Sequence, residues 1–287
     1  MGAHRPTLRD KALDRRFQRD GYVIAPVATP DEIAAARQVF DSNPSGITEG
    51  YYASIHSTDA AYKAKVDAEL SAILWPGLDR LLFDHRSLIA AFMVKEPTGA
   101  SVVPIHQDWN TMEETDRTAG ITCWLPLTSV TDAEGRFRAV PGSHRFLQRH
   151  RGSPGFPAPY EHIGEQISEQ HMVTLDVRVG DVLVMDGRVL HTTPQNTSGT
   201  TRVAAYINAL PAEVPSVHYY RAPDDGRVES FWVDDEFYTS FSIGERPPGE
   251  PFEVIPPYTE PQLTMDEFVS LMRSSRSRFA RRPRTHA

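Results

Sequence analysis

Hydrophobic and polar positions follow helical spacing in the first third of the chain. The stretch TPDEIAAARQVF begins with a capping box, Thr29 to Glu32, followed by proline at the first helical position, which predicts a helix over residues 30–41. Residues 59–74 carry apolar side chains near helical spacing and are followed by Pro76-Gly77, so a second helix is predicted to end there.

From residue 88 onward the apolar positions come in short β-rich runs instead. Gly, Pro, Asn and Asp separate these runs, a pattern typical of a β-sandwich or barrel. The runs are LIAAFMVKE, SVVPIHQDW, GITCWLPLT, RFRAVPG, HMVTLDV, GDVLVMD and TRVAAYINAL. A polar, proline-rich insertion at residues 143–170 predicts a lid or binding loop. Near the end, TMDEFVSLMR holds a second capping box, Thr264 to Glu267, which predicts a short surface helix.

Composition is that of an ordinary globular protein with a core, since 40% of the 287 residues are hydrophobic and 24% are charged. No stretch has the features of a secretory signal, and no run approaches the roughly 18 apolar residues needed to span a bilayer. We therefore expect a soluble, cytoplasmic protein without a membrane partner. The single Cys123 excludes an internal disulfide and any cysteine-based metal site, so a metal would be held by His, Asp or Glu.

The charge distribution gives no support to a nucleic-acid partner. The net charge is -8, whereas phosphate binding normally needs a basic face. Arginines gather only at residues 273–287, RSSRSRFARRPRTHA, where the composition predicts a disordered tail in preference to a binding arm.

The stretch VPIHQDWN places His106 and Asp108 two positions apart in an apolar run, so both side chains would leave the same face of a strand. A His-x-acid triplet occurs by chance about 1.5 times in a chain of this composition, so a third ligand is needed to support a metal site. His191, at the end of GDVLVMDGRVLH, is the candidate. If the following loop is a hairpin centred between residues 196 and 197, His191 lies opposite Arg202.

Two imidazoles and one carboxylate on one face of an octahedral ferrous ion leave three positions for a bidentate 2-oxo acid and O2. Arg202 offers the planar, two-pronged donor that the distal carboxylate of 2-oxoglutarate requires. The alternative for Arg202 is a structural ion pair with an internal acid such as Asp186.

Several motifs together resemble the phytanoyl-CoA dioxygenase family of Fe(II)/2-oxoglutarate oxygenases. They are HQDWN, the VPGSH at residues 140–144, the GDVLVMDGRVLH strand, an arginine eleven residues after His191, and FQRDGYVIAPV at residues 17–27. The resemblance covers residues 17–210 and departs from the family at Arg136-Phe137-Arg138. It implies a mainly β fold with flanking helices, a double-stranded β-helix of the jelly-roll, cupin-like type.

The resemblance also implies the ligands. Iron would be held by His106, Asp108 and His191, and 2-oxoglutarate by Arg202 with help from Thr193. Relatives that halogenate replace the acidic ligand by a small residue, whereas this chain keeps Asp108, so hydroxylation, desaturation or ring formation is favoured. Two less specific predictions remain. Lys95 is a candidate for binding the co-substrate, and the alternative is a solvent-facing lysine. Four aromatic residues are candidates for contact with the substrate, and the alternative is core packing: Trp109, Phe92, Trp124 and Tyr206.

These observations predict one domain, an oxygenase that oxidises a C–H bond of a small molecule such as a natural-product intermediate. The arginine-rich insertion and tail are compatible with an anionic or carrier-bound substrate. The expected parts are a helical buttress at 17–87, a jelly-roll core at 88–212 with the lid at 143–170, a cover at 213–272 and the tail at 273–287. The alternatives are a cupin-like metalloenzyme that uses Zn or Mn and a non-catalytic jelly-roll binding module.

Overall fold

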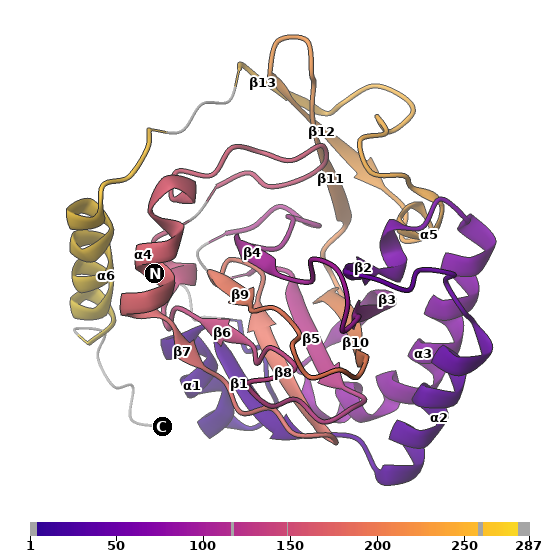
Figure 1. Cartoon of the computed structure of the whole chain (residues 1–287). Coiled ribbons are helices and arrows are strands. Elements are labelled where there is room, and N and C mark those ends of the chain that lie inside the picture. The colour runs from indigo at the N-terminus through magenta and orange to yellow at the C-terminus, as the bar shows by residue number, and fades with distance from the viewer. Residues whose placement is uncertain (1–4, 116–117, 148, 258–260, 281–287) are drawn as a thin grey trace.

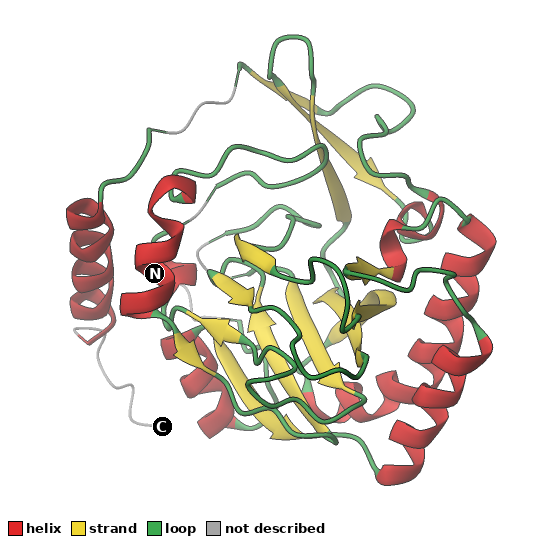
Figure 2. Ribbon diagram, viewed as in Figure 1, coloured by secondary structure: helices red, strands yellow, loops and turns green. Residues whose placement is uncertain are grey.

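The computed structural model describes residues 5–115, 118–147, 149–257 and 261–280. At its centre a six-stranded sheet, ordered β1-β8-β5-β10-β3-β2, faces a four-stranded sheet, ordered β4-β9-β6-β7 (Figures 1 and 2). A third sheet, β11-β12-β13, projects from one end of this pair. The predicted mainly β, jelly-roll fold with flanking helices is confirmed.

All strand pairs within the three sheets are antiparallel. The large sheet contains β1 (Tyr22–Pro26), β2 (Tyr51–Ala53), β3 (His85–Lys95), β5 (Ile121–Pro126), β8 (Asp181–Asp186) and β10 (Arg202–Pro211). The small sheet contains β4 (Val103–His106), β6 (Arg138–Ala139), β7 (Val173–Thr174) and β9 (His191–Thr193). The third sheet contains β11 (Ser216–Arg221), β12 (Val228–Val233) and β13 (Glu253–Ile255).

The large sheet is buried on both faces, which explains why its strands read as nearly continuous apolar runs. Along β10, Val203 and Ile207 face one way and pack with the helices, while Ala204 faces the small sheet. The helices on the first face are α1 (Lys11–Asp20), α2 (Pro30–Ser42) and α3 (Ala60–Leu81). The predicted capping box of α2 is present, since Thr29 N–H donates to the Glu32 carboxylate and Glu32 N–H donates to Thr29 Oγ1.

Helix α3 runs beyond the predicted end and contains Pro76 in its interior. Proline removes one helical hydrogen bond, so the sequence predicted a stop there. The helix continues because the turns on both sides of Pro76 bury Leu74 and Leu78 against the sheet. Gly77 permits this close packing, since a Cβ atom at that position would lie 2.8 Å from the carbonyl oxygen of Val27.

The insertion at residues 143–170 packs on the outer face of the small sheet. It forms η2 (Ser143–Arg145), η3 (Glu161–Ile163) and the start of α4 (Gly164–His171). Ile105 of β4 and Leu190, which precedes β9, pack with Ile167 of α4 and Phe268 of α6 (Met265–Ala280). In Figure 1, α6 lies beside α4.

The C-terminal helix differs from the predicted short surface helix. Its capping box is present, because Glu267 N–H donates to Thr264 Oγ1 and Thr264 N–H donates to the Glu267 carboxylate. However, Phe268 is fully buried, and the helix extends to Ala280. The prediction of disorder is therefore wrong for residues 273–280, while residues 281–287 lie outside the described residues.

The hairpin predicted between His191 and Arg202 is wrong. Strands β9 and β10 belong to different sheets, with His191 paired to His106 and Arg202 paired to Lys95. The connecting loop crosses from one sheet to the other, anchored by the Asn196 side-chain amide, which donates to the carbonyls of Lys95 and Thr200. In the part of the chain described, no helix is both long and apolar enough to cross a bilayer.

Candidate metal centre

Three side chains predicted to bind metal meet between the two sheets, at the open end of the barrel. His106 Nε2 lies 3.7 Å from Asp108 Oδ1, and His191 Nε2 lies 3.6 Å from the same oxygen. The two imidazole centroids are 4.1 Å apart. The three potential ligand atoms all lie within 4.8 Å of one another, so one ion can contact all three.

Backbone carbonyls orient both imidazoles. His106 ends β4 and faces His191 directly across the β4–β9 pair. The Nδ1 atom of His106 lies 2.8 Å from the Pro104 carbonyl oxygen, and the Nδ1 atom of His191 lies 2.9 Å from the Val189 carbonyl oxygen. A proton on each Nδ1 leaves each Nε2 free as a metal ligand, which is the usual arrangement around protein-bound metals.

Three neighbours hold Asp108 in place. Its N–H donates to the Gly187 carbonyl at 2.9 Å, and the Thr122 hydroxyl donates to Oδ2 at 2.5 Å. The Asp108 carbonyl accepts from Arg151 Nε at 2.5 Å, and Arg151 is paired with the buried Glu114 at 2.8 Å. These contacts leave Oδ1 directed toward the two imidazoles.

An aromatic stack supports His191 from the core. Phe137 lies nearly parallel to the His191 ring, with 5.0 Å between centroids, and Trp124 packs against Phe137 at 5.6 Å. Burial, together with the adjacent His106, lowers the pKa of His191 to about 4, so its imidazole is neutral and able to ligate metal at neutral pH. Phe137, within the segment that departs from the family motif, therefore buttresses a candidate ligand.

Two buried polar atoms near the barrel end lack hydrogen-bond partners in the described part of the chain: Arg202 Nε and Thr193 Oγ1. Arg202 is 2% exposed, donates from Nη1 to the Gly135 carbonyl at 2.9 Å, and lies over the Trp124 ring at 5.4 Å. An ion pair between Arg202 and Asp186 was the alternative, and it is wrong, because the Asp186 carboxylate pairs with Arg188 at 2.7 Å.

Lys95 is fully buried beside Arg202, so the solvent-facing alternative is wrong. Its Nζ atom donates to the carbonyls of Thr193, at 2.9 Å, and Pro194. Burial and the positive charge of Arg202 lower the pKa of Lys95 to about 6. Lys95 thus connects β3, the strand paired with that of Arg202, to β9, which contains Thr193. Its contact with a co-substrate stays a prediction.

A cavity of about 230 Å3 has two of the three metal-binding candidates, His106 and Asp108, in its wall. Aromatic and aliphatic side chains dominate its wall. It is lined by Tyr51, Ala53, Ile55, His56, Ile89, Met93, Val103, His106, Gln107, Asp108, Trp109, Thr111, Tyr206, Asn208 and Tyr238. Burial raises the pKa of Tyr51 to about 12 and also raises that of Tyr206, so both phenols keep their protons.

The four aromatic residues predicted to contact substrate divide into two pairs. Trp109 and Tyr206 lie in the cavity wall. Phe92 points to the opposite face of the large sheet, where its ring packs against Phe40 at 5.2 Å. Trp124 is enclosed between the two sheets. The substrate prediction is therefore wrong for Phe92 and Trp124, because strand alternation and barrel closure direct them into cores.

Sequence reasoning missed three ring-bearing side chains of the wall, Tyr51, His56 and Tyr238. Tyr51 and His56 come from β2 and η1 (Ser54–His56), and Tyr238 comes from α5 (Phe237–Ser240). The aromatic-rich stretch YYASIH was the available signal for the first two. None of the described residues of the 143–170 insertion lines this cavity. The insertion packs over the small sheet instead of forming the expected lid.

The fold and the site define a class, a jelly-roll protein with two histidines and one carboxylate placed to share a metal. Residues 52–204 match the family described as Phytanoyl-CoA dioxygenase (PhyH). This match covers more than half of the chain, and the chain belongs to that family, as its sequence motifs predicted.

Two phytanoyl-CoA dioxygenases match this chain over part of their length. Phytanoyl-CoA dioxygenase 1 of Oryza sativa subsp. japonica is 32% identical over 124 residues, which are 42% of this chain and 43% of that protein. Phytanoyl-CoA dioxygenase of Arabidopsis thaliana is 26% identical over 126 residues, again 42% of this chain and 43% of the relative. The matched region thus spans less than half the length of these relatives.

Solved structures share the fold at lower identity. The non-heme alpha ketoglutarate dependent carbocyclase SnoK from nogalamycin biosynthesis superposes with a TM-score of 0.53 and 23% identity, over 88% of this chain and 99% of that one. HygX from Streptomyces hygroscopicus, with nickel, 2-oxoglutarate and hygromycin B bound, gives a TM-score of 0.51 and 17% identity, over 71% of this chain and 88% of that one.

Proposed function

We propose that this protein is an Fe(II)- and 2-oxoglutarate-dependent dioxygenase that oxidises a C–H bond of a small molecule. The observation that carries the proposal is the convergence of His106, Asp108 and His191, two of which, His106 and Asp108, also line a cavity. Family membership supports it. Bound iron with 2-oxoglutarate and O2 supplies the oxidising power for C–H cleavage, with release of succinate and CO2.

The residues present fit both cofactors. Two neutral nitrogens and one carboxylate oxygen suit a ferrous ion and leave positions for other ligands. The unpaired Arg202 Nε and Thr193 Oγ1 are two buried donors that a carboxylate can satisfy, which supports 2-oxoglutarate binding at this end of the barrel. Buried polar groups without partners are rare in proteins, so their presence together favours a ligand there.

The protein's own groups bind, orient and exclude water. His106, Asp108 and His191 would hold the metal, and the carbonyls of Pro104 and Val189 keep the two imidazoles in the ligating tautomer. The aromatic wall positions the carbon to be oxidised and keeps bulk water away, because large apolar rings leave few sites for water to hydrogen-bond.

In this proposal, the type of oxidation is inferred from the acidic metal ligand, Asp108. An oxidation without halide is favoured because Asp108 occupies the position that halide would take, so hydroxylation is the first expectation, with desaturation or ring formation as variants. The fold does not select among them: SnoN from the same nogalamycin biosynthesis is an epimerase, with a TM-score of 0.50 and 20% identity over 89% of this chain and 97% of that one.

The earlier suggestion of an anionic or carrier-bound substrate finds no support in the cavity. No described lysine or arginine lines its wall. The arginines of the insertion are engaged elsewhere: Arg145 donates to Ser275, Arg149 to the Pro157 carbonyl and Arg151 to Glu114. We infer that the substrate is a small, natural-product-like molecule that needs no negative charge for binding. We also infer that a single oxygenase domain binds it.

The test is anaerobic addition of Fe(II) and then 2-oxoglutarate to metal-free protein, with absorption spectroscopy to detect the weak visible band of the chelated complex. The band should form with the native chain and be lost in Asp108→Ala. Arg202→Ala should need at least tenfold more 2-oxoglutarate, because it removes the carboxylate partner. Absence of a band while Zn or Mn binds tightly would favour the cupin-like metalloenzyme instead.

A further inference from the structure

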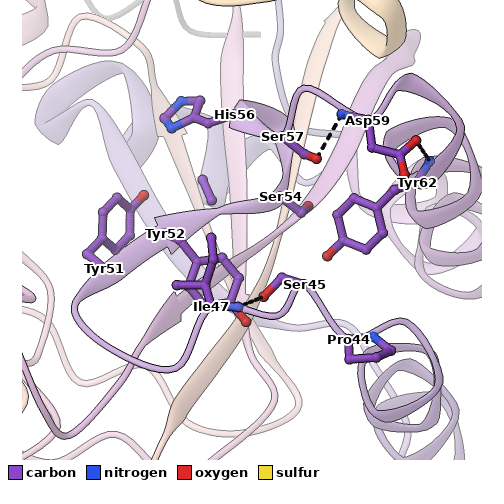
Figure 3. A pocket seen from close by; sticks show the side chains of 11 residues that line it. Pro44, Ser45, Ile47, Tyr51, Tyr52, Ser54, His56, Ser57, Asp59 and Tyr62 are labelled. Carbon is purple, nitrogen blue, oxygen red and sulfur yellow. Dashed lines mark hydrogen bonds between the residues drawn. The ribbon is translucent and has the colours of Figure 1, made fainter.

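A second cavity adjoins the cavity at the metal centre and shares part of its wall. Its volume is about 330 Å3, against about 230 Å3 for the cavity at the metal centre. Tyr51, Ala53 and His56 line both cavities and therefore mark their boundary. Figure 3 shows Tyr51 and His56 on one side of the second cavity and Tyr62 on the other.

The second cavity differs from the first in its polar groups. Its wall includes the hydroxyls of Ser54 and Ser57 (Figure 3). Ser54 Oγ accepts the Phe92 N–H at 2.8 Å, and Ser57 Oγ accepts the Asp59 N–H at 3.1 Å. Because each oxygen already accepts a backbone N–H, each hydroxyl proton is left to donate to a bound molecule.

The charged residues of the two cavity walls limit the kind of molecule that can bind there. Among the described residues neither cavity wall contains lysine or arginine, and the second cavity includes the Asp59 carboxylate. The protein as a whole carries a net charge of -8. An anion would therefore meet repulsion without a positive partner, whereas a neutral group with several hydroxyls can both accept from the serines and donate to Asp59.

We propose that the second cavity binds a neutral, hydroxyl-rich part of the substrate, such as a sugar ring, while the aromatic-walled cavity holds the part that is oxidised. The proposal rests on the proposed oxygenase function and adds the substrate class. Tyr51 and His56 lie where the two parts of such a molecule join. The specificity of the enzyme is then determined by residues 44–62 as well as by the barrel.

Three probes that share a phenoxy group test this assignment: phenyl β-D-glucopyranoside, anisole, and phenyl phosphate. Each is titrated by calorimetry into the anaerobic protein loaded with Fe(II) and 2-oxoglutarate. The glucoside should bind at least tenfold more tightly than anisole and more tightly than phenyl phosphate. Equal binding of glucoside and anisole, tighter binding of the phosphate, or no measurable binding of the glucoside would overturn the proposal.

Substitutions in the wall of the second cavity test whether the glucoside binds there. Ser57→Phe should fill the second cavity and remove the advantage of the glucoside, and Ser57→Ala should reduce it about threefold by removing one hydrogen bond. Thr58→Phe is the matched control, since Thr58 is exposed and lines neither cavity. An unchanged glucoside advantage in Ser57→Phe would overturn the proposal. Calorimetry reports binding whether or not the visible band forms, so a missing band counts only against the oxygenase function.

Discussion

At the scale of single residues, Thr193 presents a buried hydroxyl whose oxygen has no hydrogen-bond partner among the described groups. A structural hydroxyl would normally be paired, and an unpaired one costs folding free energy. A hydroxyl kept for a ligand should therefore affect ligand affinity and folding in opposite directions. This contrast separates the two roles experimentally.

Thr193→Val keeps the shape of the side chain and removes the hydroxyl. We expect the affinity for 2-oxoglutarate to fall about fivefold, equivalent to about 1 kcal/mol, since one hydrogen bond is lost. The free energy of unfolding of the metal-free protein should be unchanged or higher, because an unsatisfied polar atom is removed from the interior. Titration of the visible band and urea denaturation measure the two effects. A large loss of stability with unchanged 2-oxoglutarate affinity would show that the hydroxyl is structural.

Arg151 acts on the metal centre through the backbone of Asp108. It is 2% exposed and holds the Asp108 carbonyl while pairing with Glu114, whose side chain is 10% exposed. This contact links the 143–170 insertion to the position of a candidate metal ligand, although the insertion does not line the cavity. The contact was not predictable from sequence, because Arg151 and Asp108 are separated by 43 positions.

Arg151→Met should lower the free energy of unfolding by about 3 kcal/mol, since Glu114 would be left buried without its partner. The same substitution should weaken Fe(II) binding, because the Asp108 carbonyl loses its donor. Adding Glu114→Gln should recover part of the stability but not the Fe(II) affinity, because that donor is still missing. Urea denaturation and Fe(II) titration measure the two quantities. Arg178→Met is the control, since that side chain is 81% exposed. Full recovery of Fe(II) affinity in the double variant would contradict a positioning role.

At the scale of elements, packing decides where α3 ends. Pro76 was predicted to stop the helix, yet the helix continues to Leu81. The loss of one backbone hydrogen bond is outweighed by burial of Leu74 and Leu78, each worth about 2 kcal/mol relative to exposure. The adjacent Gly77 has a different role, since it allows the helix to approach Val27.

Substitution by alanine at these two neighbouring positions should have opposite effects. Pro76→Ala restores a backbone donor to the helix and should raise the free energy of unfolding by about 1 kcal/mol, after the larger entropy of the unfolded chain is allowed for. Gly77→Ala should lower it by at least about 1 kcal/mol, because the new Cβ would lie 2.8 Å from the Val27 carbonyl oxygen. Thermal and urea unfolding of both variants measure this difference. Destabilisation by Pro76→Ala would show that the helix needs the local geometry of proline.

At the scale of the whole molecule, three buried histidines outside the metal centre connect stability to pH. Burial lowers the pKa of His85, His144 and His218 to about 4 each. In the unfolded chain each protonates near pH 6.5. Between pH 6.5 and 4 the unfolded chain therefore binds more protons than the folded protein, so stability is full above pH 6.5 and declines as the pH falls toward 4.

We expect each histidine to contribute a slope of up to about 1.4 kcal/mol per pH unit within that window. His85→Asn should remove one such contribution, while its amide can retain the hydrogen bond that His85 Nδ1 makes with the Phe83 carbonyl at 2.7 Å. Urea denaturation of both proteins from pH 7.5 to 4.5 measures the slopes. Parallel curves for the variant and the native chain would show that His85 does not titrate on unfolding.

The sequence by itself determined the elements and the ligand types. Short β-rich runs predicted the strands, and capping boxes placed the starts of two helices. The HQD stretch supplied two candidate ligands that do come together, although β4 ends at His106 and Asp108 follows it. These features depend on local backbone geometry, which nearby residues specify. The family motifs supported the third candidate ligand, His191, and implied the jelly-roll fold.

Only the tertiary structure decided which distant segments meet. His191 faces His106 instead of Arg202, because the chain crosses between sheets where the local pattern is typical of a hairpin. Likewise, Phe92 and Trp124 enter cores while Tyr51 and Tyr238 reach the cavity. Strand pairing and barrel closure follow from burying whole apolar faces at once, a property of all the elements together that no short stretch of sequence contains.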